Sequence, residues 1–185
     1  MTEDELIEKV KEWKKKANSE TDPFDRYVSI FIAYNIFYNL YEKKKINDIN
    51  ADFFLGDSRR AIEVIELSDF ARLFDELRTD LAEYLKIIPV FREEYWPREA
   101  LRNGSRGSPI TQTLKTVFRN EDKEKTVELL VKWLYKVRCN LVHGVKSYKD
   151  THQIELLQGS AGLLDKILEH LLTRYNEKYN TSFIQ

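Results

Sequence analysis

Residues 22 to 42 read DPFDRYVSIFIAYNIFYNLYE, and their composition determines how the rest of the chain must pack. Asp22 can cap a helix and Pro23 suits the first helical position, so we expect a helix to begin here. Apolar side chains fall on nearly every side of this helix, which is typical of a helix surrounded by others. Asn35 interrupts the apolar surface, and a buried amide without a partner costs about 1 to 3 kcal/mol. The segment therefore predicts the central helix of an all-α protein, with Asn35 as a residue that supports a polar site.

Apolar residues recur at helical spacing on both sides of this segment. The pattern predicts further helices at residues 3 to 17, 59 to 66, 67 to 88, around 114 to 118, from about 120 through the motif described below, and from about 150 to 175. We expect one domain over residues 1 to 185, folded as an up-and-down helical bundle of about five to seven helices. An irregular basic loop is expected near residues 91 to 109. Gly159 and Gly162, in the last helix, would allow another helix to approach closely.

The composition excludes several classes of protein. Of the 185 residues, 42% are hydrophobic and 33% are charged, and only 6 are Gly, which disfavours a disordered chain. The one cysteine, Cys139, cannot form an internal disulfide, and no Cys and His cluster has zinc-binding spacing, so we expect no metal and no cofactor. Residues 27 to 41 are the most apolar segment, but they fall short of the roughly 20 apolar residues that span a bilayer. Because a secretory signal is also lacking, we expect a cytoplasmic protein without a membrane partner.

Basic residues gather late in the chain, although the formal net charge is only -1. Residues 129 to 149 contain no Asp or Glu, and their cations are Lys132, Lys136, Arg138, Lys146 and Lys149. A second basic stretch spans residues 92 to 119. Each stretch could bind a polyanion such as RNA. The alternative is a solvated helix face, where such runs are common.

Arg138 lies among residues that face a core. On a helix with about 100° per residue, the apolar positions Val127, Leu134 and Leu141 share one arc, and Arg138 falls inside that arc. A buried guanidinium almost always has a partner. The pattern therefore indicates either an ion pair with a carboxylate or a wet cleft for an anionic ligand.

His143 follows five residues later, about 140° away from Arg138 around a regular helix. Gly144 could end the helix in a left-handed conformation and free His143 to turn toward Arg138 or toward a second subunit. The alternative is that His143 only satisfies the last carbonyls of its helix.

The segment from Arg138 to Gly144 reads RCNLVHG, and a lysine, Lys146, and a long amphipathic helix come after it. This arrangement resembles the R-x4-6-H motif of the HEPN superfamily (higher eukaryotes and prokaryotes nucleotide-binding domains). Residues 23 to 45 also resemble the aromatic helix, with an Asn and a Tyr, that precedes this motif in the Apea-like branch. The resemblance covers residues 23 to 45 and 122 to 175. It implies an all-helical bundle that often dimerises by apposing two motif helices and that, in many members, is an endoribonuclease without a metal.

The resemblance also implies roles for single residues. Arg138 and His143 take the two catalytic positions: His143, with an ordinary pKa of about 6.5, would exchange a proton with the ribose 2′-OH or the leaving 5′-oxygen, and Arg138 would hold the phosphate oxygens. The products would be a 2′,3′-cyclic phosphate and a 5′-hydroxyl, and a homodimer would bring a second His143 into the same cleft. The other expected site residues are Asn140 for catalysis, Lys136, Lys146 and Tyr148 for RNA binding, and Asn35, Cys139 and Gly144 as supporting residues.

Three hypotheses for the function follow. We favour an RNA-cleaving toxin or antiviral defence enzyme that a partner restrains. The second is a non-catalytic HEPN module that binds a nucleotide, RNA, an antitoxin or a nucleotidyltransferase, because the family commonly has a polar residue directly after the arginine and this chain has Cys139 there, with Asn140 next. The third is a bundle without a nucleic-acid role, in which a core carboxylate pairs with Arg138.

Overall fold

The computed structural model describes residues 2 to 49, 56 to 88, 109 to 142 and 151 to 181. These residues form seven α-helices, one short 3-10 helix and no strand. The helices are α1 (Glu3–Ser19), α2 (Pro23–Ile49), α3 (Asp57–Glu63), η1 (Val64–Leu67), α4 (Phe70–Ile87), α6 (Pro109–Arg119), α7 (Lys123–Val142) and α8 (Thr151–Tyr179). The prediction of an all-α helical bundle is confirmed.

The caps that begin the helices agree with the sequence. The Asp22 carboxylate accepts the backbone N–H groups of Phe24 and Asp25, at 2.9 and 3.1 Å, and so caps α2. The Asp122 carboxylate accepts the backbone N–H of Lys125 at 3.1 Å and caps α7 in the same way. The sequence predicted the cap at Asp22, and α7 begins at Lys123, close to the start expected at about residue 120.

Several helix boundaries differ from the prediction. α2 continues past residue 42 to Ile49, because its lysines find partners: Lys44 pairs with Glu3 at 2.8 Å and Lys45 with Glu66 at 2.6 Å. The helix expected from residue 67 begins only at Phe70, since Leu67 still belongs to η1 and Ser68 is extended. The segment expected as one helix at 59 to 66 is likewise divided between α3 and η1.

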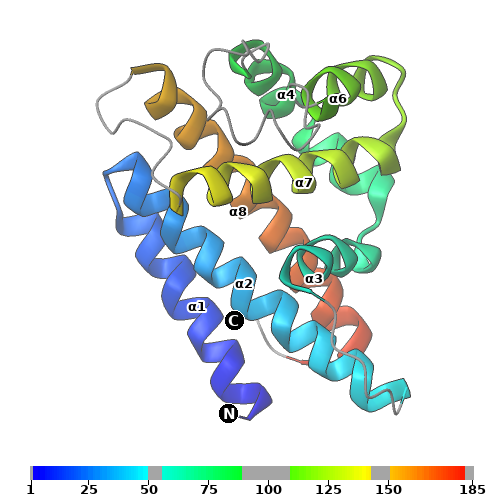
Figure 1. Ribbon diagram of the computed structural model, residues 1–185. Helices are drawn as coiled ribbons and strands as arrows, with labels where there is room; N and C mark the ends of the chain where they lie inside the picture. The colour runs from blue at the N-terminus through cyan, green and yellow to red at the C-terminus, as the bar shows by residue number, and fades with distance from the viewer. Residues whose placement is uncertain (1, 50–55, 89–108, 143–150, 182–185) are drawn as a thin grey trace.

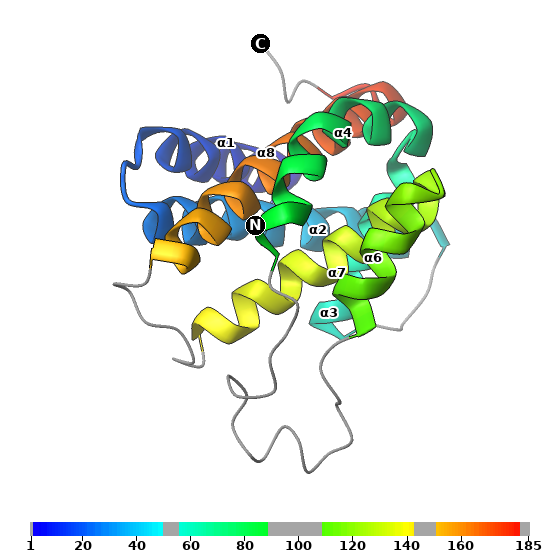
Figure 2. The ribbon, with the colours of Figure 1, turned by 90° about the horizontal axis from the view of Figure 1, so that it is seen from above.

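α2 is the central helix, as predicted. It packs against α1 on one side and against α8 on another, and α8 in turn packs against α4 (Figure 1). α7 crosses α2 rather than running along it, and Figure 2 shows α7 on the side of α2 opposite to α1. The hydroxyl of Tyr27 in α2 donates a hydrogen bond of 2.6 Å to the backbone carbonyl of Leu134 in α7. One hydrophobic core collects side chains from every described helix.

A hydrogen-bonded junction joins α4, α7 and α8. Trp133 donates its indole N–H to the Tyr84 hydroxyl at 2.9 Å, and Tyr84 lies 2.5 Å from the Ser160 hydroxyl. Because the Ser160 hydroxyl donates to the carbonyl of Leu156, Tyr84 is the donor to Ser160. All three side chains are buried, so the junction fixes the Tyr84 ring in place.

The two glycines of α8 differ in what surrounds them. A Cβ atom at Gly159 would lie 2.5 Å from Cδ2 of Tyr84, so Gly159 permits the close approach of α4 that the sequence predicted. A Cβ at Gly162 would meet no atom of the described residues within 4 Å. Among these residues, the close approach that was expected at both glycines occurs at Gly159 alone.

Candidate functional site

Arg138 lines a small pocket between α7 and α2. Its side chain is half-buried, and its guanidinium carbon lies 5.7 Å from the centroid of the Phe31 ring, which is cation–π distance. The pocket measures about 260 Å³. Its lining residues are Tyr27, Val28, Phe31, Ile32, Asn35, Arg138 and Leu141.

No carboxylate pairs with Arg138 in the part of the chain that the structure describes; its contact is the Phe31 ring. Glu42 is the partner of Arg60, at 3.1 Å, and is not available to Arg138. The structural ion pair that the sequence left open is thus not formed among these residues. A guanidinium carries five N–H donors, so Arg138 keeps donors that can bind an anion in the pocket.

Asn35 reaches the same pocket from α2, and Asp57 holds it there. The Asn35 amide donates to the Tyr38 hydroxyl and, at 3.5 Å, to Oδ1 of Asp57. Tyr38 donates to the same Asp57 oxygen at 2.6 Å, and Tyr135 of α7 donates to Oδ2 at 2.9 Å. Asn39 donates to the side-chain oxygen of Asn35 at 3.1 Å. The partners that a buried amide needs are therefore present.

Asp57 is a residue whose wider role the sequence did not reveal. The sequence favoured Asp57 or Ser58 as the cap of the helix expected at residues 59 to 66, but α3 already includes both, and its N-cap is Gly56. Asp57 instead joins α2, α3 and α7, and Arg60 lies 3.5 Å from its Oδ1. Burial, and then the hydrogen bond to Asp57, raise the pKa of Tyr135 to about 12, and the same two causes raise the pKa of Tyr38 further. Both hydroxyls therefore stay protonated and can serve Asp57 as donors at neutral pH. The only local signal was an acidic residue next to a turn.

The remaining described candidates do not share the face of Arg138. Lys136 and Asn140 each lie about 160° from Arg138 around α7, and Cys139 lies about 100° away. All three side chains are half-buried, and Cys139 is a free thiol. Loss of hydration on burial lowers the pKa of Lys136. The structure thus brings together Arg138 and Asn35, but it does not place Lys136 or Asn140 beside them.

Four predicted site residues lie outside the described residues: His143, Gly144, Lys146 and Tyr148. The basic loop expected near 91 to 109 also lies outside them, except that Pro109 begins α6. Within the described ranges, no three His, Cys, Asp or Glu side chains come together as metal ligands. None of the helices described combines the length and the apolar character that crossing a membrane requires.

Comparison of the chain with models of known protein families, with curated proteins and with solved structures gives no match.

Proposed function

We propose that the protein is a metal-independent endoribonuclease of the HEPN type, acting as a toxin or an antiviral defence enzyme. The observation that carries the proposal is the position of Arg138, which lines a pocket with aromatic walls and has no carboxylate partner among the described residues. A guanidinium in that setting suits a phosphate group, because its planar fork matches the phosphate oxygens and its charge is not already neutralised.

Arg138 would stabilise the negative charge that builds on the phosphate oxygens as the ribose 2′-OH attacks phosphorus and the bond to the 5′-oxygen breaks. His143 would take the 2′-OH proton or give a proton to the leaving 5′-oxygen. One chain supplies a single motif histidine, whereas the reaction needs both an acid and a base. A homodimer across α7 would provide the second histidine from the partner subunit.

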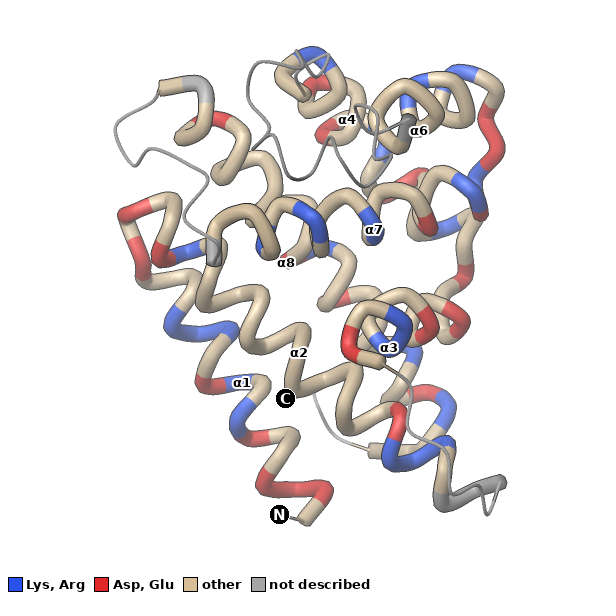
Figure 3. The backbone as a smooth tube through the Cα atoms, in the orientation of Figure 1, with Lys and Arg blue, Asp and Glu red and all other residues tan. Residues whose placement is uncertain are grey.

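The charge along α7 supports a polyanionic ligand. In the described part of α7 after Glu128, all the charged residues are basic (Figure 3). They are Lys132, Lys136 and Arg138. Lys132 forms an ion pair with Glu128, whereas Arg138 has no carboxylate partner among the described residues, so Arg138 is the cation that carries this argument. RNA binding through such contacts would weaken as salt concentration rises.

A non-catalytic HEPN module is the second candidate, and Cys139 favours it. The position after the motif arginine commonly holds a polar residue in that superfamily, whereas this chain has a half-buried thiol there. Such a module would bind RNA, a nucleotide, an antitoxin or a nucleotidyltransferase through the same surface without cutting.

Cleavage of cellular RNA in the presence of EDTA tests the proposal. We expect wild-type protein to cut RNA and to leave 2′,3′-cyclic phosphate ends, and we expect Arg138→Ala and His143→Ala to lose at least about 100-fold in rate. Arg119→Ala is the matched control, because Arg119 is an exposed cation on α6 away from the pocket. Its rate should stay within about twofold of wild type.

The outcomes separate the two candidates. Cleavage that persists in the Arg138→Ala, His143→Ala double variant would rule out the proposed catalytic site. RNA binding without any cleavage, lost in Arg138→Ala and kept in His143→Ala, would establish the binding module instead.

A further inference from the structure

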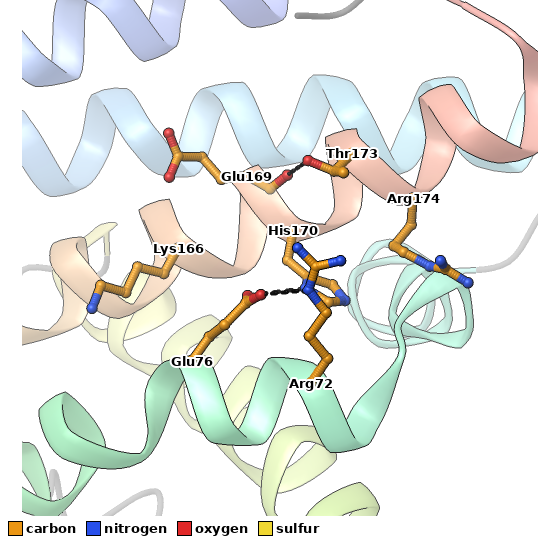
Figure 4. Close-up of a pocket in the computed structure, with 7 residues that line it drawn as sticks. All are labelled: Arg72, Glu76, Lys166, Glu169, His170, Thr173 and Arg174. Atoms are coloured by element: carbon orange, nitrogen blue, oxygen red, sulfur yellow. Dashed lines mark hydrogen bonds and ion pairs between the residues drawn. The ribbon is translucent and has the colours of Figure 1, made fainter.

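A second cavity lies between α4 and α8, and it shares no residue with the Arg138 pocket. It measures about 390 Å³. Its lining residues are Arg72, Glu76, Lys166, Glu169, His170, Thr173 and Arg174 (Figure 4). The proposed ribonuclease activity uses none of them.

His170 is the most buried polar side chain of this cavity, with 2% of its side chain exposed. Its Nδ1 lies 3.1 Å from Oε2 of Glu76, and the other oxygen of Glu76 accepts from Nε of Arg72 at 2.9 Å. An ionised carboxylate only accepts, so Nδ1 of His170 must carry a proton and donate it to Glu76. Nε2 is then the free end of the ring. It is buried and has no partner among the described residues.

Arg174 presents a second nitrogen of this kind. It follows His170 by one helical turn, so both side chains project from the same face of α8. Its Nη1 pairs with Glu177 at 2.5 Å, but its Nε is buried without a hydrogen-bond partner in the described part of the chain. Buried polar atoms without hydrogen-bond partners are rare in folded proteins and call for an explanation.

The two carboxylates that line the cavity, Glu76 and Glu169, already accept hydrogen bonds from nitrogen groups. Glu76 accepts from Arg72 and His170, as described above. The carboxylate of Glu169 points away from the Glu76, Arg72 and His170 group in Figure 4, and it accepts from Lys14 of α1 at 2.8 Å. Asp69, which caps α4, accepts the backbone N–H of Arg72 at 3.1 Å. The groups left without partners in the cavity are therefore two nitrogens: Nε of Arg174, which is a donor, and Nε2 of His170, which becomes a donor when the ring takes up a second proton.

We infer that this cavity binds a phosphate group, either as the free ion or as a small phosphomonoester. Nε2 of His170 would share a proton with a phosphate oxygen, Arg174 would donate through Nε, and Arg72 through the end of its guanidinium. A tetrahedral oxyanion has enough acceptor oxygens for all three. It would share the cations of the lining with the carboxylates that already pair with them, namely Glu76 with Arg72, Asp80 with Lys166 and Glu177 with Arg174. A cation would meet the positive side chains instead, and an apolar ligand would leave both buried nitrogens unsatisfied.

NMR of the histidine ring protons tests the inference on the full chain, with the His170 signal assigned by its absence from His170→Gln. Titration with inorganic phosphate at constant ionic strength should shift the His170 signal saturably in the millimolar range or below. Arg174→Gln should weaken binding at least tenfold. Arg78→Gln is the matched control. Like Arg174→Gln, it removes one exposed ion pair with a glutamate, here Glu121, but Arg78 lies outside the cavity.

A parallel titration with ribose 5-phosphate identifies the source of the phosphate group. Tighter binding of ribose 5-phosphate than of inorganic phosphate would assign the cavity to a phosphomonoester, and the reverse order would assign it to the free ion. The inference is overturned if phosphate up to about 50 mM leaves the His170 signal unshifted, or if Arg174→Gln binds as well as wild type. It is also overturned if Arg138→Ala, and not Arg174→Gln, abolishes the shift, since the phosphate would then occupy the Arg138 pocket.

Discussion

At Arg138 the guanidinium rests on an aromatic ring instead of a carboxylate, and this determines what the side chain contributes to stability. The Phe31 ring is 5.7 Å away, and Arg138 is only half-buried. Contacts of this kind contribute about 0.5 to 1 kcal/mol at accessible sites. A broken buried ion pair, in contrast, costs about 3 to 5 kcal/mol because a charge is left unpaired.

We therefore expect Arg138→Ala to lower the free energy of unfolding by about 1 kcal/mol or less, as measured by urea denaturation. Arg60→Ala is the reference variant, because Arg60 pairs at 3.1 Å with Glu42, whose side chain is only 9% exposed. It should lose clearly more stability. Equal losses in the two variants would indicate that Arg138 has a charged partner after all.

The same residue also shows how far sequence reasoning reaches. Helical periodicity placed Arg138 inside the buried arc of its helix, whereas the structure leaves it half-buried. Burial demanded partners for Asn35, but neither argument related the two residues to each other. Asp57 connects the two helices, because it accepts hydrogen bonds from Asn35 of α2 and from Tyr135 of α7. Tyr135 is 78 positions away from Asp57 in the chain. Periodicity gives the direction of a side chain around its own helix axis, and it cannot say which other helix that side chain meets.

At the scale of helices, the contact of α4 with α8 depends on the absence of a side chain. Tyr84 cannot turn away from an added methyl group at Gly159, because its hydroxyl is held by both Trp133 and Ser160. A Cβ at residue 159 would lie 2.5 Å from the ring, so the two helices would have to separate.

We expect Gly159→Ala to lower the free energy of unfolding by about 1 to 3 kcal/mol. Gly162→Ala is the matched control on the same helix, where the added Cβ has open space within 4 Å. It should raise stability by about 0.5 to 1 kcal/mol, because alanine favours a helix over glycine. Thermal and urea unfolding of both variants measure the difference, and losses of equal size would contradict the role given to Tyr84.

The helix boundaries show the same division between local and distant causes. The starts of α2 and α7 could be predicted because their caps, Asp22 and Asp122, lie within a few residues of the groups they bind. The extension of α2 to Ile49 could not, since it accompanies ion pairs that Lys44 and Lys45 make with other helices. Local chemistry thus predicted where these helices begin, and tertiary contacts determined where α2 ends.

For the molecule as a whole, buried tyrosines make stability depend on high pH. Burial raises the pKa of Tyr84 to about 12, and it raises the pKa values of Tyr27 and Tyr34 further, compared with about 10 for an exposed tyrosine. Between these values the unfolded chain loses protons that the folded chain keeps, so ionisation favours unfolding. The stability that the protonated, buried tyrosines give the folded state is fully present below pH 10, and it is lost as the pH rises through about 12.

We therefore expect these tyrosines to leave the free energy of unfolding constant from pH 8 to about pH 10. Above that pH, the free energy of unfolding should fall steeply. Absorbance at 295 nm, which reports tyrosinate, should show part of the ten tyrosines ionising only together with the loss of helical circular dichroism. Ionisation of all ten near pH 10 while the helices remain intact would contradict the burial described here.

The contacts of α1 have a consequence for synthesis of the chain on the ribosome. Glu3 accepts hydrogen bonds from Lys44 of α2 at 2.8 Å and from Tyr175 of α8 at 3.0 Å, so α1 binds one neighbour that is made soon after it and one that is made much later. At about 5 to 20 residues per second, the interval between α2 and the end of α8 lasts roughly 6 to 25 s. During that time α1 and α2 can pair with each other, but the apolar side of α2 that α8 will cover stays open. The nascent chain therefore exposes an apolar face of α2 to chaperones until α8 has left the exit tunnel.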